Sequence, residues 1–100
     1  MTTQEFLENL KKTFDDCYRI CAIKNSDYAD KDNPFKNFMN SELIGISAEK
    51  GILVRTMDKM TRMSNLLERE GKVSDEKIED TINDAIGYLA ILKALIISRK

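Results

Sequence analysis

Residues 78–97 read IEDTINDAIGYLAILKALII, and this stretch decides the fold because it carries two apolar stripes at helical spacing. The first stripe consists of Ile78, Ile82, Ala85, Ile86, Leu89, Leu92 and Ile96. The second consists of Tyr88, Ile91 and Leu95. A helix that is apolar on two sides is buried on two sides. The rest of a 100-residue chain can hardly cover both stripes, so we expect a homo-oligomer, a dimer or a higher assembly, to complete the core.

The N-terminal third of the chain is predicted to be one long helix followed by a loop and a short helix. Breakers are scarce, since the chain has four glycines and a single proline, and this favours few and long helices. Apolar periodicity predicts the first helix over residues 3–25. Residues 25–34 are rich in turn-forming side chains and predict a loop. Pro34 then opens a short helix that carries Phe35, Phe38 and Met39.

A third helix is expected from an N-cap at Ser47 to about residue 69, with Gly71 as its stop. Its apolar row is Ile52, Leu53, Met57, Met60, Met63 and Leu67. Ser74 is the expected cap of the C-terminal helix. The sequence therefore predicts one all-α domain over residues 1–100, a small helical bundle of three long helices and one short helix.

Composition and charge exclude several classes of function. The net charge is −1, from 16 basic and 17 acidic residues, so no basic field exists and a nucleic-acid partner is not expected. Histidine is absent, which excludes an imidazole base and leaves oxygen ligands, suited to Mg²⁺ or Mn²⁺, for any metal. Cys17 and Cys21 are expected to be buried, reduced thiols. The N-terminus lacks a secretory segment, and the apolar run at residues 85–97 is interrupted by Lys93 and too short to span a membrane. We expect a cytoplasmic protein without a membrane partner.

Four charged residues share one arc of the helix expected over residues 47–69. At roughly 100° per residue, Arg55, Asp58, Lys59 and Arg62 fall within an arc of about 100°. The ordinary interpretation is a solvated face with ion pairs at three- and four-residue spacing. The functional alternative is a group of cations that neutralises phosphate oxygens.

Asp80 and Asp84 lie four residues apart on one face of the C-terminal helix. Like charges at this spacing destabilise a helix by about 0.2–0.5 kcal/mol unless a cation lies between them. The simpler alternative is a pair that faces water. If the two long helices pack antiparallel, Asp58 can face this pair, and the three carboxylates would bind Mg²⁺ or Mn²⁺, with Glu49 as a further oxygen ligand. Asp58 and Asp84 would then be the catalytic residues, holding a metal-activated water for phosphoanhydride hydrolysis.

A third cluster surrounds the predicted loop. Lys24 precedes it, Asp27 and Tyr28 lie within it, and Asn37 follows it between two phenylalanines. An aromatic ring can stack on a base and Asn37 can read a base edge, whereas the two phenylalanines are also suited to anchoring the loop on the core. The chain has neither GxGxxG nor GxxxxGK[ST], so any phosphate must be bound by side chains or metal.

These residues together resemble the nucleotide modification associated domain 1 family of phages and bacteria, over about residues 20–95. The resemblance rests on Lys24-x-x-Asp27-Tyr28, Phe35-x-Asn37-Phe38, Arg55-x-x-Asp58-Lys59-x-x-Arg62 and Asp80-Thr81-x-x-Asp84-x-x-x-Tyr88. The family is similar in its helical pattern to the MazG-like all-α nucleoside triphosphate pyrophosphatases, which bind Mg²⁺ through ExxE and ExxD motifs. This chain has Arg55-x-x-Asp58 in place of ExxE, and Asp27-Tyr28-Ala29 where the family has Asp-Tyr-Gly.

The resemblance implies a protein that handles nucleotides, either a magnesium-dependent pyrophosphatase-like hydrolase or a binding protein for nucleoside phosphates. Metal ligands would be Asp58, Asp80 and Asp84. Ligand-binding residues would be Lys24, Asp27, Tyr28, Asn37, Arg55, Lys59 and Arg62. The alternative is a non-catalytic helical interaction or oligomerisation module, which explains the two-sided C-terminal helix equally well.

Overall fold

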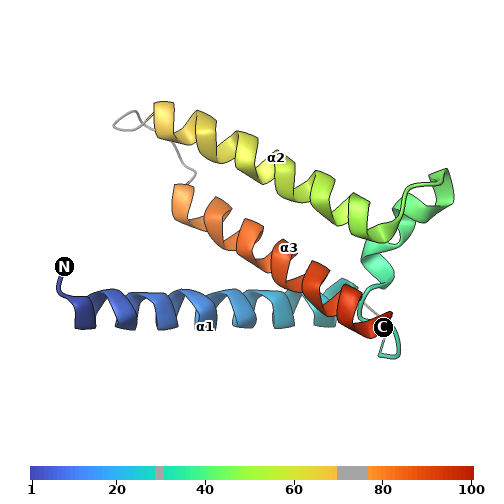
Figure 1. Cartoon of the computed structure of the whole chain (residues 1–100), viewed down its shortest axis with the longest axis horizontal. Helices are drawn as coiled ribbons and strands as arrows, with labels where there is room; N and C mark the ends of the chain where they lie inside the picture. Colours follow the sequence, from blue (N-terminus) through green and yellow to red (C-terminus); the bar gives the residue numbers. More distant parts are fainter. Residues whose placement is uncertain (29–30, 70–76) are drawn as a thin grey trace.

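The computed structural model of the chain describes residues 1–28, 31–69 and 77–100. Three long α-helices, α1 (Thr3–Tyr28), α2 (Ala48–Glu68) and α3 (Ile78–Ser98), account for most of the chain. Between α1 and α2 lie two short 3-10 helices, η1 (Lys36–Phe38) and η2 (Asn40–Ile44) (Figure 1). The described ranges contain no β-strand. The predicted all-α fold, with three long helices and a short helical segment, is confirmed.

Helix α1 is longer than predicted, because it continues from Asn25 to Tyr28. Local side-chain hydrogen bonds support the extension, since the Ser26 hydroxyl donates to the Ile23 carbonyl at 2.6 Å. The Asn25 amide donates to the carbonyl of Pro34 at 3.0 Å and so ties the end of α1 to the start of the short segment. Asp27, predicted within the loop, therefore lies on the helix, as the predicted helical residue Lys24 does.

The predicted short helix is present as 3-10 structure. Asn33 stabilises the turn before η1, because its side-chain oxygen accepts a hydrogen bond from the Phe35 amide at 3.1 Å. The second 3-10 helix, η2, was not expected from the sequence, and it ends at Gly45, whose φ of +81° lies in the left-handed region that glycine favours. Phe35, Phe38 and Met39, which lie in or beside η1, pack on the core.

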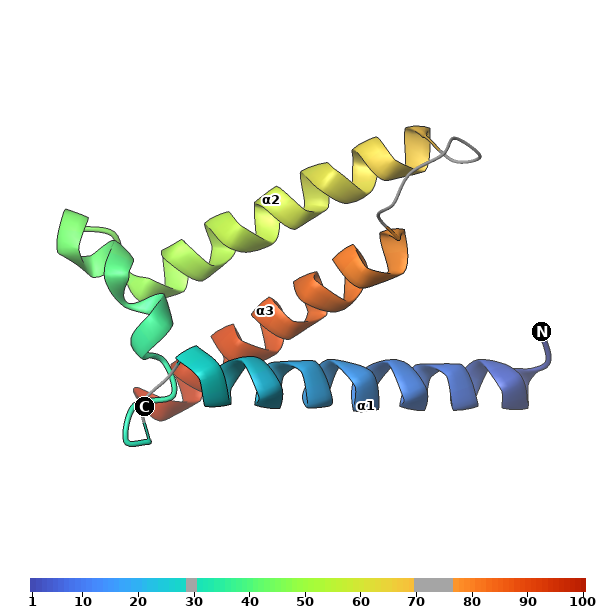
Figure 2. The same cartoon turned by 180° about the vertical axis from the view of Figure 1, so that it is seen from behind.

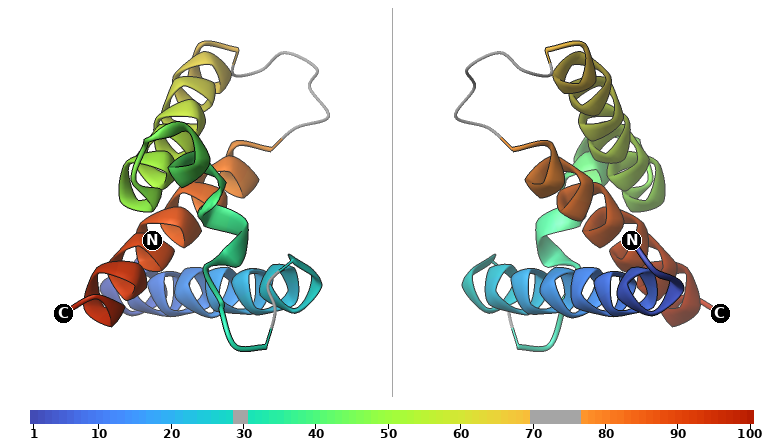
Figure 3. Two further views of the ribbon diagram at one scale, coloured as in Figure 1. Left: turned by 90° about the vertical axis from the view of Figure 1, so that its right-hand side faces the viewer. Right: turned by 90° about the vertical axis from the view of Figure 1, so that its left-hand side faces the viewer.

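The three long helices are arranged around α3. Helices α2 and α3 run antiparallel and pack along each other, while α1 crosses α3 over a shorter stretch (Figures 1 and 2). Figure 3 shows η1 on one side of the α2–α3 pair, and Figure 1 shows η2 near the N-terminal end of α2. The core lies where these elements meet and is centred on Ala48, Ile52 and Leu95. Partly buried side chains packed against it are Phe35, Phe38, Met39, Tyr88, Ile91 and Leu92.

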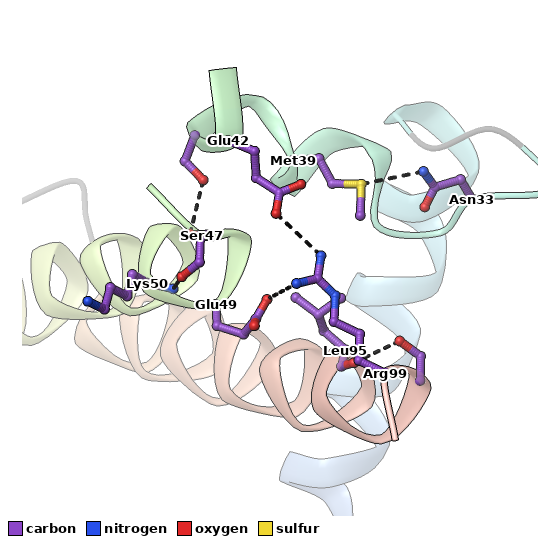
Figure 4. A network of polar contacts seen from close by, with 10 residues as sticks. Asn33, Met39, Glu42, Ser47, Glu49, Lys50, Leu95 and Arg99 are labelled. Carbon is purple, nitrogen blue, oxygen red and sulfur yellow. Dashed lines mark hydrogen bonds and ion pairs between the residues drawn. The ribbon is translucent and has the colours of Figure 1, made fainter. Parts of the chain in front are cut away.

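Polar contacts at the start of α2 link three elements (Figure 4). The predicted N-cap Ser47 is confirmed, because its hydroxyl accepts a hydrogen bond from the Lys50 amide at 3.2 Å. Arg99, just beyond α3, donates to Glu49 Oε1 at 2.8 Å and to Glu42 Oε2 at 3.5 Å. The end of α3 is thereby tied to η2 and to the first turn of α2. The predicted stop at Gly71 and cap at Ser74 lie outside the described residues.

The inward faces of the long helices differ from the predicted apolar rows. Helix α2 buries Ala48, Ile52 and Thr56, and the Thr56 hydroxyl is satisfied by the Ile52 carbonyl at 2.9 Å. The exposed members of its predicted row are Leu53, Met57, Met60 and Leu67. On α3, the second stripe is covered within the chain, since Leu95 is buried and Tyr88 and Ile91 pack on the core.

Helix α3 is unusual in its exposure. Among the described helices, α3 is the one long and apolar enough to cross a membrane by length and composition, a criterion that core helices of soluble proteins also meet. About 22% of its apolar window is buried within the chain. Part of its first stripe, namely Ile82, Leu89 and Ile96, is exposed.

Candidate functional site

A cavity of about 560 Å³ lies between the second half of α1, η1 and the middle of α3. This volume falls within the roughly 300–1,000 Å³ that small-molecule sites occupy. Its aromatic lining consists of Tyr18, Phe35, Phe38 and Tyr88. Its polar lining consists of Lys24, Asn25, Asn37, Arg55, Asn83 and Asp84. Apolar walls with a few converging polar groups are typical of a site for an organic ligand.

The polar end of the cavity is organised by Asp84. Its Oδ1 lies 3.6 Å from the Lys24 ammonium of α1, and its Oδ2 lies 3.1 Å from the Lys59 ammonium of α2. The Asp84 and Lys59 side chains are each 27% exposed, so this contact is better shielded from water than a surface pair. Lys59 comes from α2 and Asp84 from the first half of α3, so this contact links the two antiparallel helices. One carboxylate thus joins all three long helices.

Arg55 forms the next part of the wall. Its guanidinium carbon lies 4.9 Å from the centre of the Phe38 ring, and one terminal nitrogen donates to the Asn37 carbonyl at 3.3 Å. The Phe38 ring in turn meets Tyr88 edge to face, with centroids 6.4 Å apart. These contacts hold the guanidinium flat against an aromatic surface, a geometry that suits arginine.

The floor of the cavity is the crossing of α1 and α3. A Cβ added at Gly87 would lie 2.9 Å from the Cys21 sulfur, so glycine allows the two helices to approach closely. The Cys17 thiol donates to the backbone carbonyl and the side-chain oxygen of Asn83 at 3.7 and 3.6 Å. Burial is the main reason why the pKa values of Cys17 and Cys21 lie above the ordinary thiol range. The expected reduced thiols are present, with Cys17 buried and Cys21 partly buried.

The structure brings together five of the residues predicted for the site. Four of them line the cavity, namely Lys24, Asn37, Arg55 and Asp84. Lys59 does not line it but pairs with Asp84. Lys24 and Asn37 come from α1 and η1, respectively, so residues distant in sequence converge here.

Other predicted residues lie elsewhere. Asp27, Asp58, Arg62 and Asp80 are exposed and do not line the cavity. Tyr28 is the last residue of α1, and its side chain lies outside the described part of the structure. Asp58 does not face Asp84 because it is displaced by about 100° from its neighbour Lys59, which occupies that place instead.

The predicted magnesium site has no ligand group in the described ranges. No cluster of three acidic or thiol side chains suited to a metal is present there. Both oxygens of Asp84 face lysine ammonium groups, and Glu49, the predicted further ligand, pairs with Arg99. These carboxylates do not fit a resident divalent ion, so the magnesium site stays a prediction.

Sequence reasoning missed several lining residues, among them Tyr18, Asn25, Asn83 and Gly87. One signal was available, because a glycine in the middle of an apolar helix often marks a close approach to another chain segment. Asn25 could not be found, because its role depends on α1 continuing past its predicted end.

No protein-family model matches the chain, and no characterised protein or solved structure shows significant similarity to it. The assignment of a function therefore rests on the geometry of the cavity.

Proposed function

We propose that this protein binds a nucleoside phosphate, with the base or sugar in the aromatic part of the cavity and the phosphate groups at its basic end. The observation that carries the proposal is an aromatic wall beside two cationic side chains that line the cavity, Lys24 and Arg55, with Lys59 paired to the lining residue Asp84.

The charge balance at this end favours an anionic guest. Of the described residues that line the cavity, Asp84 is the one carboxylate, and its single negative charge is shared by two lysines. Arg55 adds a third positive charge, and among the described residues it contacts a neutral carbonyl and a ring. A phosphate group brings the negative charge that would balance this excess, and cations bind it by charge-assisted hydrogen bonds.

The aromatic end favours a planar guest. Tyr18, Phe38 and Tyr88 offer ring surfaces, and stacking of a base on an aromatic side chain contributes about 1–3 kcal/mol. The amides of Asn25, Asn37 and Asn83 supply the donors and acceptors that read a base edge. A simple sugar or a purely apolar ligand would not use both the aromatic wall and the basic end of the cavity.

Binding, rather than hydrolysis, is the activity that this arrangement supports directly. A divalent ion would arrive with the phosphate groups of the ligand. The more specific proposal is that the protein is a magnesium-dependent pyrophosphatase. Release of phosphate or pyrophosphate from nucleoside triphosphates, with and without Mg²⁺ or Mn²⁺, measures that activity directly.

The test of binding is calorimetric titration of the protein with three probes: a nucleoside, the corresponding triphosphate and inorganic tripolyphosphate. We expect the triphosphate to bind at least tenfold more tightly than either fragment, because only it fills both ends of the cavity. The titrations are repeated across the common bases.

Equal affinity for tripolyphosphate and for every triphosphate would contradict the role of the aromatic wall. Absence of binding by all nucleotides would contradict the proposal as a whole. Tyr88→Leu provides a further check, because it removes a ring from the cavity while keeping an apolar side chain, and it should weaken the triphosphate more than tripolyphosphate.

A second candidate function, a helical interaction module, is favoured by a separate observation. Large apolar side chains on α2 and α3 are exposed on the side of these helices that does not line the cavity. This surface is compatible with nucleotide binding, because the two features occupy different faces.

A further inference from the structure

The chain exposes more surface than a folded monomer of its size. Its accessible surface is 7848 Å² for a mass of 11.5 kDa, whereas a compact monomer of that mass exposes about 5,800 Å². Its radius of gyration is 15.6 Å, against about 13 Å for a compact domain of 100 residues. About 2,000 Å² of surface per chain is thus in excess, compared with roughly 800 Å² per partner in a stable protein interface.

The exposed apolar side chains of α1 include Phe6, Leu7 and Phe14, and a separate apolar surface lies on the two neighbouring helices α2 and α3. We call it the open face, and it consists of Leu53, Met57 and Met60 of α2 with Ile82, Leu89 and Ile96 of α3. The α3 residues recur every seven positions, and the α2 residues recur at four and three. This spacing is the pattern of a seam that packs against another helix.

Both rows point to the same side of the α2–α3 pair. Ile52 and Leu95 mark the inward directions of the two helices, since both are 1% exposed. At about 100° per residue, the α2 row lies about 80–140° around the helix axis from Ile52. The α3 row lies about 100–140° around its axis from Leu95, and both angles have the same sense of rotation. Because the helices are antiparallel, an equal rotation carries both rows to one side of the pair.

The opposite side of the pair is already covered. Arg55 and Asp84 lie on the other side of the two inward directions, where they line the cavity beneath η1. Figure 3 shows η1 on that side. The α2–α3 pair therefore has one face packed within the chain and one apolar face exposed.

We propose that the open face binds a second copy of this chain, so that two α2–α3 pairs pack face to face as a four-helix bundle. Two antiparallel helix pairs that each present an apolar face form such a bundle by short-range packing alone. A symmetric arrangement uses the same surface on both copies, so no complementary partner surface is needed. The excess area per chain is sufficient for an interface of this kind.

Charge argues against other occupants. A membrane span is opposed by α2, which packs along α3 and carries Arg55, Asp58 and Arg62, groups that are costly in a bilayer core. An acidic or basic partner is opposed by the open face itself, whose six side chains are all uncharged. Lys93 lies at its edge, where a long side chain can extend its ammonium group into water.

The test is the molar mass of the full chain in solution, measured by sedimentation equilibrium over a range of concentrations. The wild type should have twice the 11.5 kDa mass of one chain. Leu89→Glu should weaken association at least about hundredfold, because a symmetric interface would bury the new charge twice. Val54→Glu is the matched control, since Val54 is 58% exposed on the same pair but points away from the open face.

Several outcomes would overturn the proposal. These are a monomeric wild type at millimolar concentration, dissociation by Val54→Glu with Leu89→Glu unaffected, or flotation of the wild type with phosphatidylcholine vesicles. If Leu89→Glu fails to fold, the urea midpoint of the wild type decides, because it must rise with protein concentration for a dimer and stay constant for a monomer. Neither readout involves a nucleotide, so this proposal and the nucleotide site fail separately.

Discussion

Lys59 on α2 and Asp84 on α3 lie 3.1 Å apart, at the point where a metal-binding carboxylate was expected to face a second one. Lys24 of α1 approaches the other oxygen of Asp84 at 3.6 Å. The carboxylate therefore serves as a counter-ion that holds two cations beside the cavity. In this arrangement the lysines are positioned by Asp84 and remain able to bind a second anion.

Replacement of Asp84 by asparagine separates this role from that of a metal ligand. Asp84→Asn should preserve or strengthen nucleotide binding, because it raises the positive charge at the basic end of the cavity. The loss of the half-buried pairs should lower the free energy of unfolding by about 1 kcal/mol or less. Calorimetry with a triphosphate, with and without Mg²⁺, measures the first effect and urea unfolding the second. If binding requires Mg²⁺ and disappears in this variant, Asp84 acts as a metal ligand.

The crossing of α1 and α3 predicts a specific double-mutant result. Gly87→Ala should lower the free energy of unfolding by about 1–3 kcal/mol, because the added methyl group meets the Cys21 sulfur at 2.9 Å. In a Cys21→Ala background the same change should be neutral or stabilising by up to about 1 kcal/mol, because alanine is the better helix former. Urea unfolding of the four proteins measures this coupling. An equal cost of Gly87→Ala in both backgrounds would show that the sulfur is not the obstacle.

The two thiols predict a loss of stability at alkaline pH. Burial raises the pKa values of Cys17 and Cys21, so the folded chain keeps these protons at pH values where the unfolded chain releases them. Their contribution is therefore complete below the unfolded thiol pKa, near 8.5, and declines as the pH rises beyond it. Urea unfolding between pH 7 and 10 should show a steeper decline for the wild type than for a Cys17→Ala/Cys21→Ala variant. Parallel curves for the two proteins would contradict this explanation.

The C-terminal ion pairs predict a small, salt-dependent effect. Arg99→Gln removes contacts to Glu49 and Glu42 from a side chain that is 39% exposed. The expected loss is below about 1 kcal/mol at low salt and smaller in molar salt, because screening weakens exposed pairs. Thermal unfolding at two ionic strengths measures it, with Lys50→Gln, a charged residue near the start of the same α2 helix, as the control. A loss that grows with salt would rule out a screened ion pair.

Helix identity could be predicted from the sequence because scarce breakers and strong apolar periodicity leave few alternatives. The Ser47 cap followed from local chemistry alone. The end of α1 did not, because Asn25 and Ser26 favour turns in isolation and are retained in the helix by hydrogen bonds to neighbouring carbonyls.

The inward direction of each helix was harder to predict than its bounds. Of the predicted apolar row of α2, the chain buries Ile52 but exposes Leu53 and Met57, and it buries Thr56, which was not in the row. Periodicity shows that a face is apolar but does not show which neighbour covers it. The same limit explains why Lys59, rather than Asp58, meets Asp84.

The most direct test of the nucleotide site is the dissociation constant of a nucleoside triphosphate for the wild type, Arg55→Gln and Arg62→Gln. Both variants remove one positive charge from α2, but Arg55 lines the cavity whereas Arg62 does not. We predict binding that Arg55→Gln weakens about tenfold or more, and that Arg62→Gln leaves within about twofold. Equal weakening by both variants, or no binding by the wild type, would contradict the account.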